Sequence, residues 1–349
     1  MDPRLSRRAA LAAAIAAPLA APHVAHAQGA RPQVRFAYDW ILNGPYAFGI
    51  AGERMGFFRE AGVDITIQRG FGSARVALDM SAGQFDIAMA DPTPMLRFMS
   101  QNPNNDLVAV ALLWDQAPTA VTVRADGPIM RVADLAGKTL AAPEFDGGRQ
   151  VFPAFAAVNN IPLSSINWMS VSPELREPML VQRRADGITG FVTSTALSLR
   201  ALGMDLPAQR IFRYREHGLD FFYGSFLVTT RTYAERNPDA VRAVVSGMIR
   251  SMRWAFANRA EAITHLRARE QLSDVAIESV RQDMAMAELV DSPNSRRLGL
   301  GPIEAPRFNR QIEAVKLAFQ LGDMPTVDRF YTDRFLPPAA ERMLPQRAA

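Results

Sequence analysis

The stretch Phe85-Asp86-Ile87-Ala88-Met89-Ala90-Asp91-Pro92 predicts a buried strand followed at once by a helix. Its apolar run is as long as a short strand, and an aspartate followed by proline is typical of the N-cap and first position of a helix. In an open α/β sheet, small ligands bind in the crevice at the carboxyl ends of the strands. The stretch therefore predicts a junction of the kind that carries binding sites.

Three other phrases are expected to lie at similar junctions, where a strand stops and a helix starts. They are Asp39-Trp40 with Asn43, Gly70-Phe71-Gly72-Ser73, and Asp134-Leu135-Ala136-Gly137-Lys138-Thr139. In the second phrase the glycines are expected to make a tight turn, and Ser73 to cap the helix that follows.

Strands and helices are predicted to alternate along two series, and the rest of the chain is predicted to be almost wholly helical. The first series has strands near residues 34–38, 63–67, 85–90 and 107–113, and the second has extended segments near 138–142, 166–169, 188–192 and 210–214. Such alternation implies right-handed βαβ units and mainly parallel sheets. From residue 237 onward the apolar residues follow a helical spacing.

The first residues are predicted to be a cleaved export signal. Arg4, Arg7 and Arg8 precede a short apolar run at residues 9–21, and Ala25-His26-Ala27 supplies a small-x-small cleavage site. The arginine pair is equally compatible with a twin-arginine signal and with an ordinary secretory signal. We expect a periplasmic protein that starts near residue 28 and is not embedded in the membrane.

The composition argues against a nucleic-acid partner and against a catalytic centre. The net charge is +4 and the sequence contains no cysteine, and arginines and acidic residues are interspersed without a basic cluster. Beyond the predicted signal the only histidines are His217 and His265, and no nucleophile elbow or phosphate-binding loop is present. We expect no cofactor and no metal site.

Taken together, the phrases resemble those of the nitrate/sulfonate/taurine-type solute-binding proteins of ABC importers, especially the branch that binds thiamine-pyrimidine precursors. The phrases at residues 56–62 and 237–241 add to the resemblance. It implies a two-lobed periplasmic binding protein of type II. Lobe I would hold residues 32–120 plus 225–349 and lobe II residues 121–224, with hinge strands near 120–123 and 223–228.

The resemblance also implies that residues of the opening motif face a cleft. Trp40 would stack on a flat ring and Asn43 would hydrogen-bond a polar group, although the alternatives are a core tryptophan and a turn asparagine. The chain departs from the branch at Tyr46, where binders of pyrimidine precursors usually have histidine. Gly72 and Ser73 offer a helix N-terminus to polar atoms, or form a plain capped turn.

The remaining candidate ligand-binding residues come from the first series and from lobe II. Asp91 would bind an amine or serve only as an N-cap, and Arg149 would pair with a carboxylate or sulfonate or lie on the surface. The segments 144–149 and 189–193 of lobe II would face the cleft. The other candidates are Phe145 and Trp114 as aromatic clamps, Thr189 and Thr193 at a strand end, and Tyr223 beside the second hinge.

The sequence predicts a monomeric receptor that closes over one small molecule and delivers it to an inner-membrane ABC permease and its ATPase. A heteroaromatic ligand is the first expectation and a small sulfonate or carboxylate the second. One alternative is a pyrimidine-synthase-like enzyme, which needs a cysteine-rich motif and a pyridoxal-phosphate lysine, whereas this chain has no cysteine and Lys138 lies in a phrase typical of binders. Another is a ligand-sensing subunit of a membrane receptor.

Overall fold

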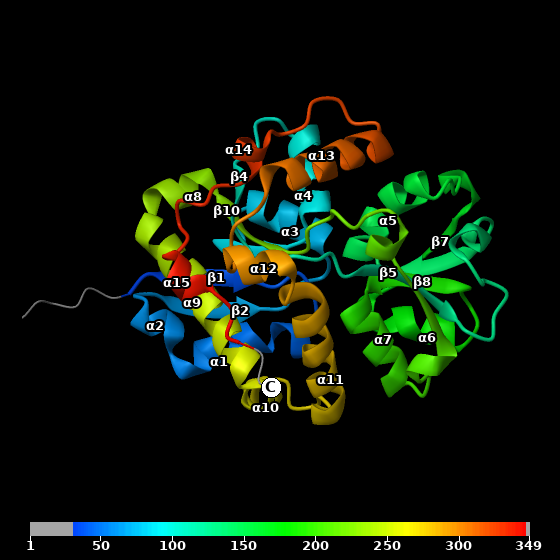
Figure 1. The fold of residues 1–349 in the computed structure, drawn as a ribbon, viewed down its shortest axis with the longest axis horizontal. Coiled ribbons are helices and arrows are strands. Elements are labelled where there is room, and N and C mark those ends of the chain that lie inside the picture. The colour runs from blue at the N-terminus through cyan, green and yellow to red at the C-terminus, as the bar shows by residue number, and fades with distance from the viewer. Residues whose placement is uncertain (1–30, 347–349) are drawn as a thin grey trace, which may run out of the picture. The chain divides into compact units, whose positions relative to one another are not determined.

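Two five-stranded sheets organise the chain in the computed structural model, which describes residues 31–346 (Figure 1). We call the part built on the first sheet lobe I and the part built on the second sheet lobe II. The sheet of lobe I has the order β2-β1-β3-β10-β4, from β1 (Gln33–Ala37), β2 (Asp64–Gln68), β3 (Ile87–Ala90), β4 (Leu107–Leu112) and β10 (Phe226–Thr230). The sheet of lobe II has the order β7-β6-β8-β5-β9, from β5 (Thr119–Arg124), β6 (Thr139–Ala142), β7 (Asn167–Ser170), β8 (Gly187–Phe191) and β9 (Gln209–Arg213).

Each sheet contains one strand that runs against its neighbours. β1 pairs in parallel with β2 and β3, and β6 with β7 and β8, whereas β10 is antiparallel to β3 and β4 and β5 is antiparallel to β8 and β9. The reversed strands are those that the chain enters after passing from one sheet to the other, between β4 and β5 and between β9 and β10. The predicted α/β fold with two lobes is confirmed, and both lobes belong to one compact unit that begins at Pro32.

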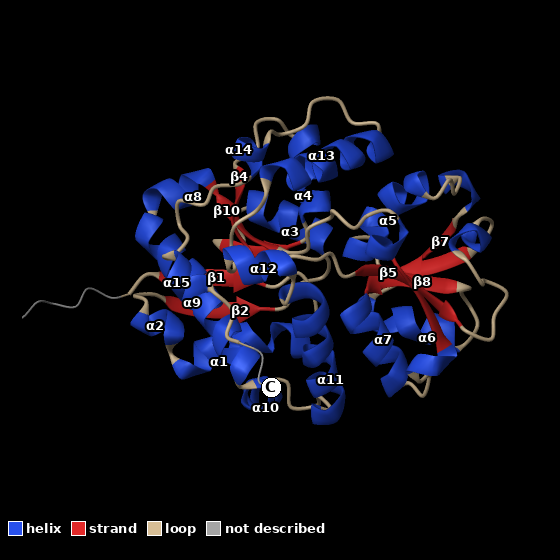
Figure 2. Cartoon of the chain, in the orientation of Figure 1, coloured by secondary structure: helices blue, strands red, loops and turns tan. Residues whose placement is uncertain are grey.

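Helices surround both sheets (Figure 2). Lobe I carries α1 (Ala47–Met55), α2 (Phe57–Glu60), α3 (Ser73–Ser81), α4 (Pro92–Gln101), α8 (Arg231–Arg236), α9 (Pro238–Ala257), α10 (Arg259–Arg269), α11 (Val275–Ala285), α12 (Pro293–Leu298), α13 (Ala305–Phe319), α14 (Val327–Phe330) and α15 (Ala339–Arg342). Lobe II carries α5 (Gly147–Val158), α6 (Arg176–Val181) and α7 (Val192–Ala201). None of the helices between residues 31 and 346 has the length and apolarity needed to cross a membrane.

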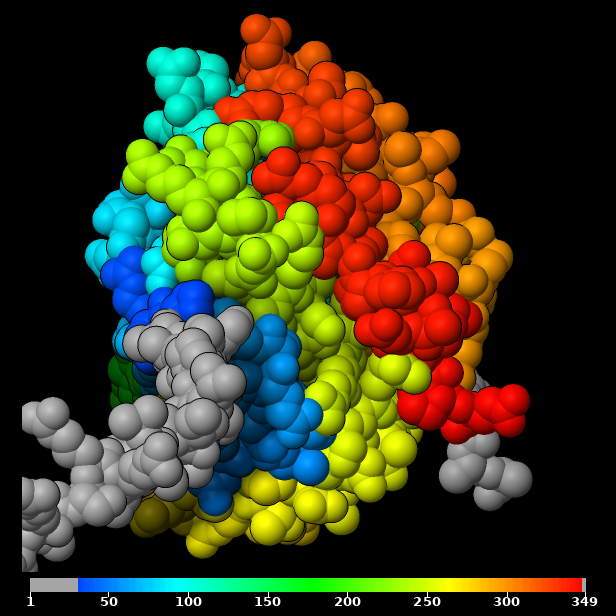
Figure 3. All heavy atoms as spheres, turned by 90° about the vertical axis from the view of Figure 1, so that its left-hand side faces the viewer, coloured from blue at the N-terminus to red at the C-terminus, as the bar shows by residue number. Residues whose placement is uncertain are grey.

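The helical tail completes lobe I by packing on helices from the start of the chain. Helix α9 contacts α1, α2 and α15, so that the first and last parts of the described chain lie together on one face (Figure 3). The apolar stripe that the sequence predicted on α9, including Val241, Val245 and Met252, is buried. Burial of this stripe is what fixes the tail on lobe I.

One of the four junction phrases does not lie where it was predicted. The phrases at Asp39 and Gly70 follow β1 and β2, and the phrase at Phe85 contains β3 and ends at the start of α4. In the fourth phrase, Asp134 belongs to a 3-10 turn, η2 (Val132–Leu135), and Thr139 begins β6. Asp134 accepts the backbone N–H groups of Met130 and Arg131, both at 3.0 Å, which closes the turn before the strand. The prediction that this phrase ends a strand and starts a helix is therefore wrong.

Candidate ligand-binding cleft

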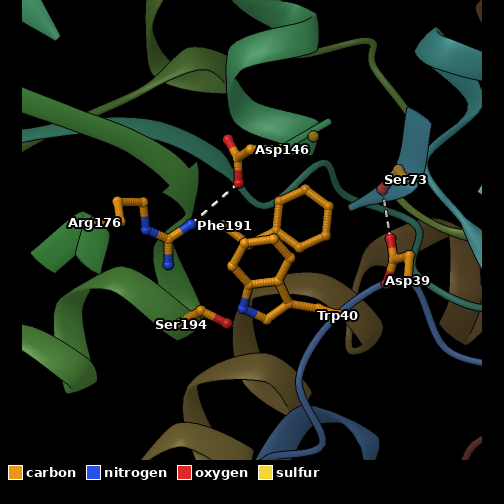
Figure 4. A pocket seen from close by; sticks show the side chains of 8 residues that line it. Asp39, Trp40, Ser73, Asp146, Arg176, Phe191 and Ser194 are labelled. Carbon is orange, nitrogen blue, oxygen red and sulfur yellow. Dashed lines mark hydrogen bonds and ion pairs between the residues drawn. The ribbon is translucent and has the colours of Figure 1, made fainter. Parts of the chain in front are cut away.

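The carboxyl ends of parallel strands from both lobes meet at one small cavity (Figure 4). Asp39 and Trp40 follow β1, Asp146 follows β6, and Phe191 ends β8. This placement is the crevice that open α/β sheets use for ligands. The residues that line the cavity are Asp39, Trp40 and Ser73 from lobe I and Asp146, Gly147, Arg176, Phe191 and Ser194 from lobe II.

The cavity is much smaller than a small-molecule site. The cavity volume is about 10 Å³, which is roughly what a single water molecule needs. Small-molecule sites measure about 300–1,000 Å³. A ring compound can therefore enter only if the walls, which belong to different lobes, move apart.

Asp39 is a buried carboxylate held by two hydroxyl groups. Tyr46 donates to Oδ1 at 2.8 Å and Ser73 donates to Oδ2 at 2.5 Å. Burial raises the pKa of Asp39 to about 6, although the two hydroxyl donors act in the opposite direction. The predicted N-cap role of Ser73 is wrong: α3 begins at Ser73 itself, and its hydroxyl is directed to Asp39.

Arg176 is buried between two carboxylates of lobe II. Its Nη1 lies 3.1 Å from Asp146 Oδ2 and its Nη2 lies 2.6 Å from Glu177 Oε1, and the side chain is only 2% exposed. The guanidinium also lies over the ring of Trp40, 4.9 Å from its centroid, which is a cation–π distance. Asp146 in turn caps α5 by accepting the N–H of Arg149 at 2.9 Å.

Asp91 is a fourth buried carboxylate near the cavity. Its side chain accepts the N–H of Thr93 at 2.7 Å and so caps α4, as one of the two sequence-based interpretations expected. Burial raises the pKa of Asp91 to about 7, and the charges of Asp39 and Asp146 add to the increase. Its predicted role toward an amine stays a prediction.

Asn43 connects the two lobes at the edge of the cavity. Its Nδ2 donates to Ser194 Oγ at 3.2 Å, whereas its Oδ1 is buried and accepts no hydrogen bond from residues 31–346. Arg281 on α11 holds the same part of lobe II, donating to the backbone oxygens of Thr193 at 3.1 Å and of Ser194 at 2.7 Å.

Tyr46, Trp114 and two threonines support the cavity from behind. Tyr46 lies against Trp114 with a centroid separation of 5.6 Å, and Trp114 is buried in the core, which is the alternative that the sequence left open for it. Thr189 donates weakly to Asp146 Oδ1 at 3.4 Å, and Thr193 is buried at the start of α7.

Of the predicted site residues, Trp40 and Ser73 line the cavity and the others do not. Three of these others, Arg149, Tyr223 and Phe145, make their contacts elsewhere. Arg149 donates to Ala142 O at 3.2 Å and to Ser170 Oγ at 2.9 Å. Tyr223 accepts the N–H of Glu304 at 2.8 Å through its hydroxyl, beside a separate small hollow in lobe I. Phe145 contributes its backbone oxygen to a contact with Gly72 and Ala74 across the lobes.

Several lining residues were not singled out as ligand contacts from the sequence. Asp146 lies in the segment 144–149 that was expected to face the cleft, and it follows a strand and caps a helix as Asp91 does. Arg176 had no local signal, because Asp146 lies far from it in the sequence and reaches it only in the folded lobe. Asp39 and Ser194 were likewise not named as lining residues, whereas Gly147 and Phe191 fall in the segments 144–149 and 189–193 that were expected to face the cleft.

The raised pKa of Asp91 leads to a prediction about stability. The folded state holds a proton on Asp91 up to about pH 7, whereas an unfolded aspartate loses it near its ordinary pKa of 3.8. Between these values the folded state binds more protons, so stability should rise as pH falls from 8 to 5, by about 1–3 kcal/mol. Asp91→Asn keeps the cap and should remove most of this rise in urea unfolding; an unchanged pH dependence would contradict the assignment.

Comparisons with known proteins agree on the fold. Residues 44–262 match the model of the protein family described as "NMT1/THI5 like". The riboflavin-binding protein RibY of Chloroflexus aurantiacus is 21% identical over 89% of this chain and 88% of its own length. Among solved structures, the alkanesulfonate-binding protein SsuA of Xanthomonas axonopodis pv. citri, bound to MOPS, has a TM-score of 0.66 at 17% identity, over 90% of this chain and 98% of its own. The nitrate-binding protein NrtA of Synechocystis PCC 6803 has a TM-score of 0.67 at 12% identity, over 89% and 91% of the two chains.

Proposed function

Starting from the premise that the chain belongs to the NMT1/THI5-like family, we propose that it is the periplasmic receptor of an ABC importer and binds a small heteroaromatic molecule. The lobes close over the ligand, which leaves chemically unaltered, and the closed form docks on an inner-membrane permease with its ATPase. The similarity to SsuA and NrtA, which are binding proteins with this fold, supports the general role.

The observation that carries this proposal is the composition of the cavity wall. Trp40 from lobe I and Phe191 from lobe II both line the cavity, together with polar groups of Asp39, Ser73 and Ser194. Aromatic surfaces with a few placed polar groups are what selective small-molecule sites use. A flat ring that enters between the lobes would gain contact with aromatic surface from each of them.

The charges favour a heteroaromatic ligand over a small sulfonate or carboxylate. An anionic ligand would be favoured by a cation that is free to pair with it. Arg176, which lines the cavity, already pairs with Asp146 and Glu177, and Arg149 makes its hydrogen bonds elsewhere in lobe II. The relative RibY, whose name states that it binds riboflavin, gives an example of a flat heteroaromatic ligand.

The enzyme alternative lacks residues for its chemistry at this site. A pyridoxal-phosphate enzyme needs a lysine that reaches the cofactor. Lys138 immediately precedes β6 and Lys316 lies on α13, and neither belongs to the cavity lining. We therefore propose binding without turnover, and purified protein should show no pyridoxal absorbance.

A thermal-shift screen tests the proposed function. The screen would cover thiamine precursors, flavins, sulfonates and aromatic acids. A compound at 100 times its dissociation constant should add about 2.7 kcal/mol to the free energy of unfolding. The proposal expects heteroaromatic compounds to give the largest shifts, and a screen in which none of them stabilises the protein would contradict it.

Removing the indole of Trp40 should weaken binding of the best compound from this screen. Loss of a stacked aromatic wall is expected to cost about 1–3 kcal/mol, or roughly tenfold to a hundredfold in affinity. Trp168→Ala is the matched control, because Trp168 packs on Arg149 and Phe152 in lobe II and does not line the cavity. If calorimetry gives Trp40→Ala and the wild-type protein equal affinities, the ligand does not bind at Trp40.

A further inference from the structure

We infer that the cleft selects a positively charged ring compound, whose ammonium or protonated ring nitrogen lies against Asp39. This inference rests on the proposed function and specifies the chemical class of its ligand. It is carried by three features of the cavity: its charge balance, a buried acceptor without a donor, and the aromatic surface beside the carboxylate.

The charges around the cavity are unbalanced. Arg176 is shared between Asp146 and Glu177. Arg281, which holds Ser194, pairs with Glu278 at 3.1 Å, so neither arginine pairs with Asp39 or Asp91. Within residues 31–346, neither Asp39 nor Asp91 forms an ion pair, and each is 1% exposed. Because a buried carboxylate without a cationic partner is costly, a cation that binds beside Asp39 would relieve that cost.

A buried amide oxygen gives independent evidence for a ligand rich in hydrogen-bond donors. Asn43 is 7% exposed, and its Nδ2 is engaged by Ser194 of the cavity lining. Its Oδ1 has no donor among the described residues. Buried acceptors are normally satisfied, so a ligand N–H group at this edge of the cavity would complete the hydrogen bonding.

An organic cation fits this wall better than a metal ion. Metal ions of the calcium and magnesium type need several oxygen ligands gathered around one point. Among residues 31–346 no three His, Cys, Asp or Glu side chains are grouped to hold a metal ion. Trp40 and Phe191 instead offer faces that attract an organic cation, and Arg176 already uses the face of Trp40 in this way.

The raised pKa values of the buried carboxylates agree with this site, and they provide a second way to measure ligand binding. The groups that act on the pKa of Asp39 are the hydroxyls of Tyr46 and Ser73, which lower it, and the charges of Asp146 and Asp91, which raise it. Arg176 lines the same cavity but pairs with Asp146 and Glu177. Burial raises the pKa of Asp39 to about 6 and of Asp91 to about 7. A bound cation favours the ionised carboxylates, so binding near pH 6.5 should release protons, and affinity should fall as pH is lowered from 8 to 5.

The test compares three compounds that share one ring and differ in charge: benzylamine, benzyl alcohol and phenylmethanesulfonate. Calorimetry with the wild-type protein at pH 8 should give benzylamine at least tenfold tighter binding than benzyl alcohol, with the sulfonate weakest. Asp39→Asn should remove this preference. Asp239→Asn is the control, because Asp239 is 95% exposed on α9 and its loss should leave the preference intact.

The wild-type protein alone also tests the inference, in case Asp39→Asn folds poorly. Titrations of benzylamine in two buffers of different ionisation enthalpy should show proton release near pH 6.5, and the dissociation constant should rise at least tenfold from pH 8 to pH 5. The inference is overturned if benzyl alcohol or the sulfonate binds as tightly as benzylamine, if no protons are released, or if none of the three binds. If heteroaromatic compounds still bind through Trp40, the proposed receptor function stands although this inference fails. If the screen finds no heteroaromatic compound that binds, both the receptor function and this inference are contradicted.

Discussion

Arg176→Met is expected to lower the free energy of unfolding by about 3–5 kcal/mol, because it leaves two buried carboxylates without their cation. Asp146 and Glu177 lie 3.1 Å and 2.6 Å from the guanidinium, and both are almost fully buried. Methionine fills a similar volume but offers no charge and no hydrogen-bond donor. Urea unfolding at pH 7.5 measures the loss.

A surface pair provides the control for this substitution. Arg242 pairs with Asp239 at 2.6 Å, but these side chains are 53% and 95% exposed. Arg242→Met should cost about 1 kcal/mol or less, since exposed ion pairs contribute little. Combining Arg176→Met with Asp146→Asn and Glu177→Gln should recover part of the lost stability. A loss below 1 kcal/mol for Arg176→Met would show that the buried carboxylates do not depend on it.

Gly72→Ala is expected to weaken ligand binding by about tenfold to a hundredfold. Gly72 has φ 124° and ψ 147°, and a methyl group there would lie 2.1 Å from the backbone oxygen of Phe145, which belongs to lobe II. Relief of that clash requires the lobes to separate, and overpacking of this kind costs about 1–3 kcal/mol. Calorimetry with the compound that binds most tightly measures the change.

Gly62→Ala separates this interlobe clash from backbone strain. Gly62 has φ 108°, so alanine is strained there as well, but nothing lies within 4 Å of the added methyl group. Both variants should therefore lose stability, and only Gly72→Ala should lose affinity as well. Equal affinities of the two variants would mean that the contact between Gly72 and Phe145 does not control closure.

The sequence predicted the elements of the fold better than it predicted their pairing. The apolar run before Asp91 and the stripe on α9 are local patterns, and both were found as predicted. The reversed strands β5 and β10 were not predicted, because their direction depends on partners in distant parts of the chain. The phrase at Asp134 failed because a glycine-containing turn looks alike before and after a strand.

The candidate site was predicted only where it depends on a local motif. Trp40, Ser73 and Asp91 lie at strand ends and were named, although the hydroxyl of Ser73 bonds Asp39 and does not cap the helix. Arg149 was named and Arg176 was not, yet Arg176 lines the cavity. One sequence pattern cannot separate two arginines whose roles depend on carboxylates that the fold brings to them.

The distance between the lobes in solution tests the central claim most directly. The sequence contains no cysteine, so spin labels attach only at introduced cysteines. Two exposed positions suit them, Leu272→Cys in lobe I and Leu202→Cys in lobe II. Pulsed dipolar spectroscopy should show a shift to a shorter, narrower distance distribution when a compound shown by calorimetry to bind is added to saturation. A distribution that stays unchanged at that saturation would contradict a receptor whose lobes close over its ligand.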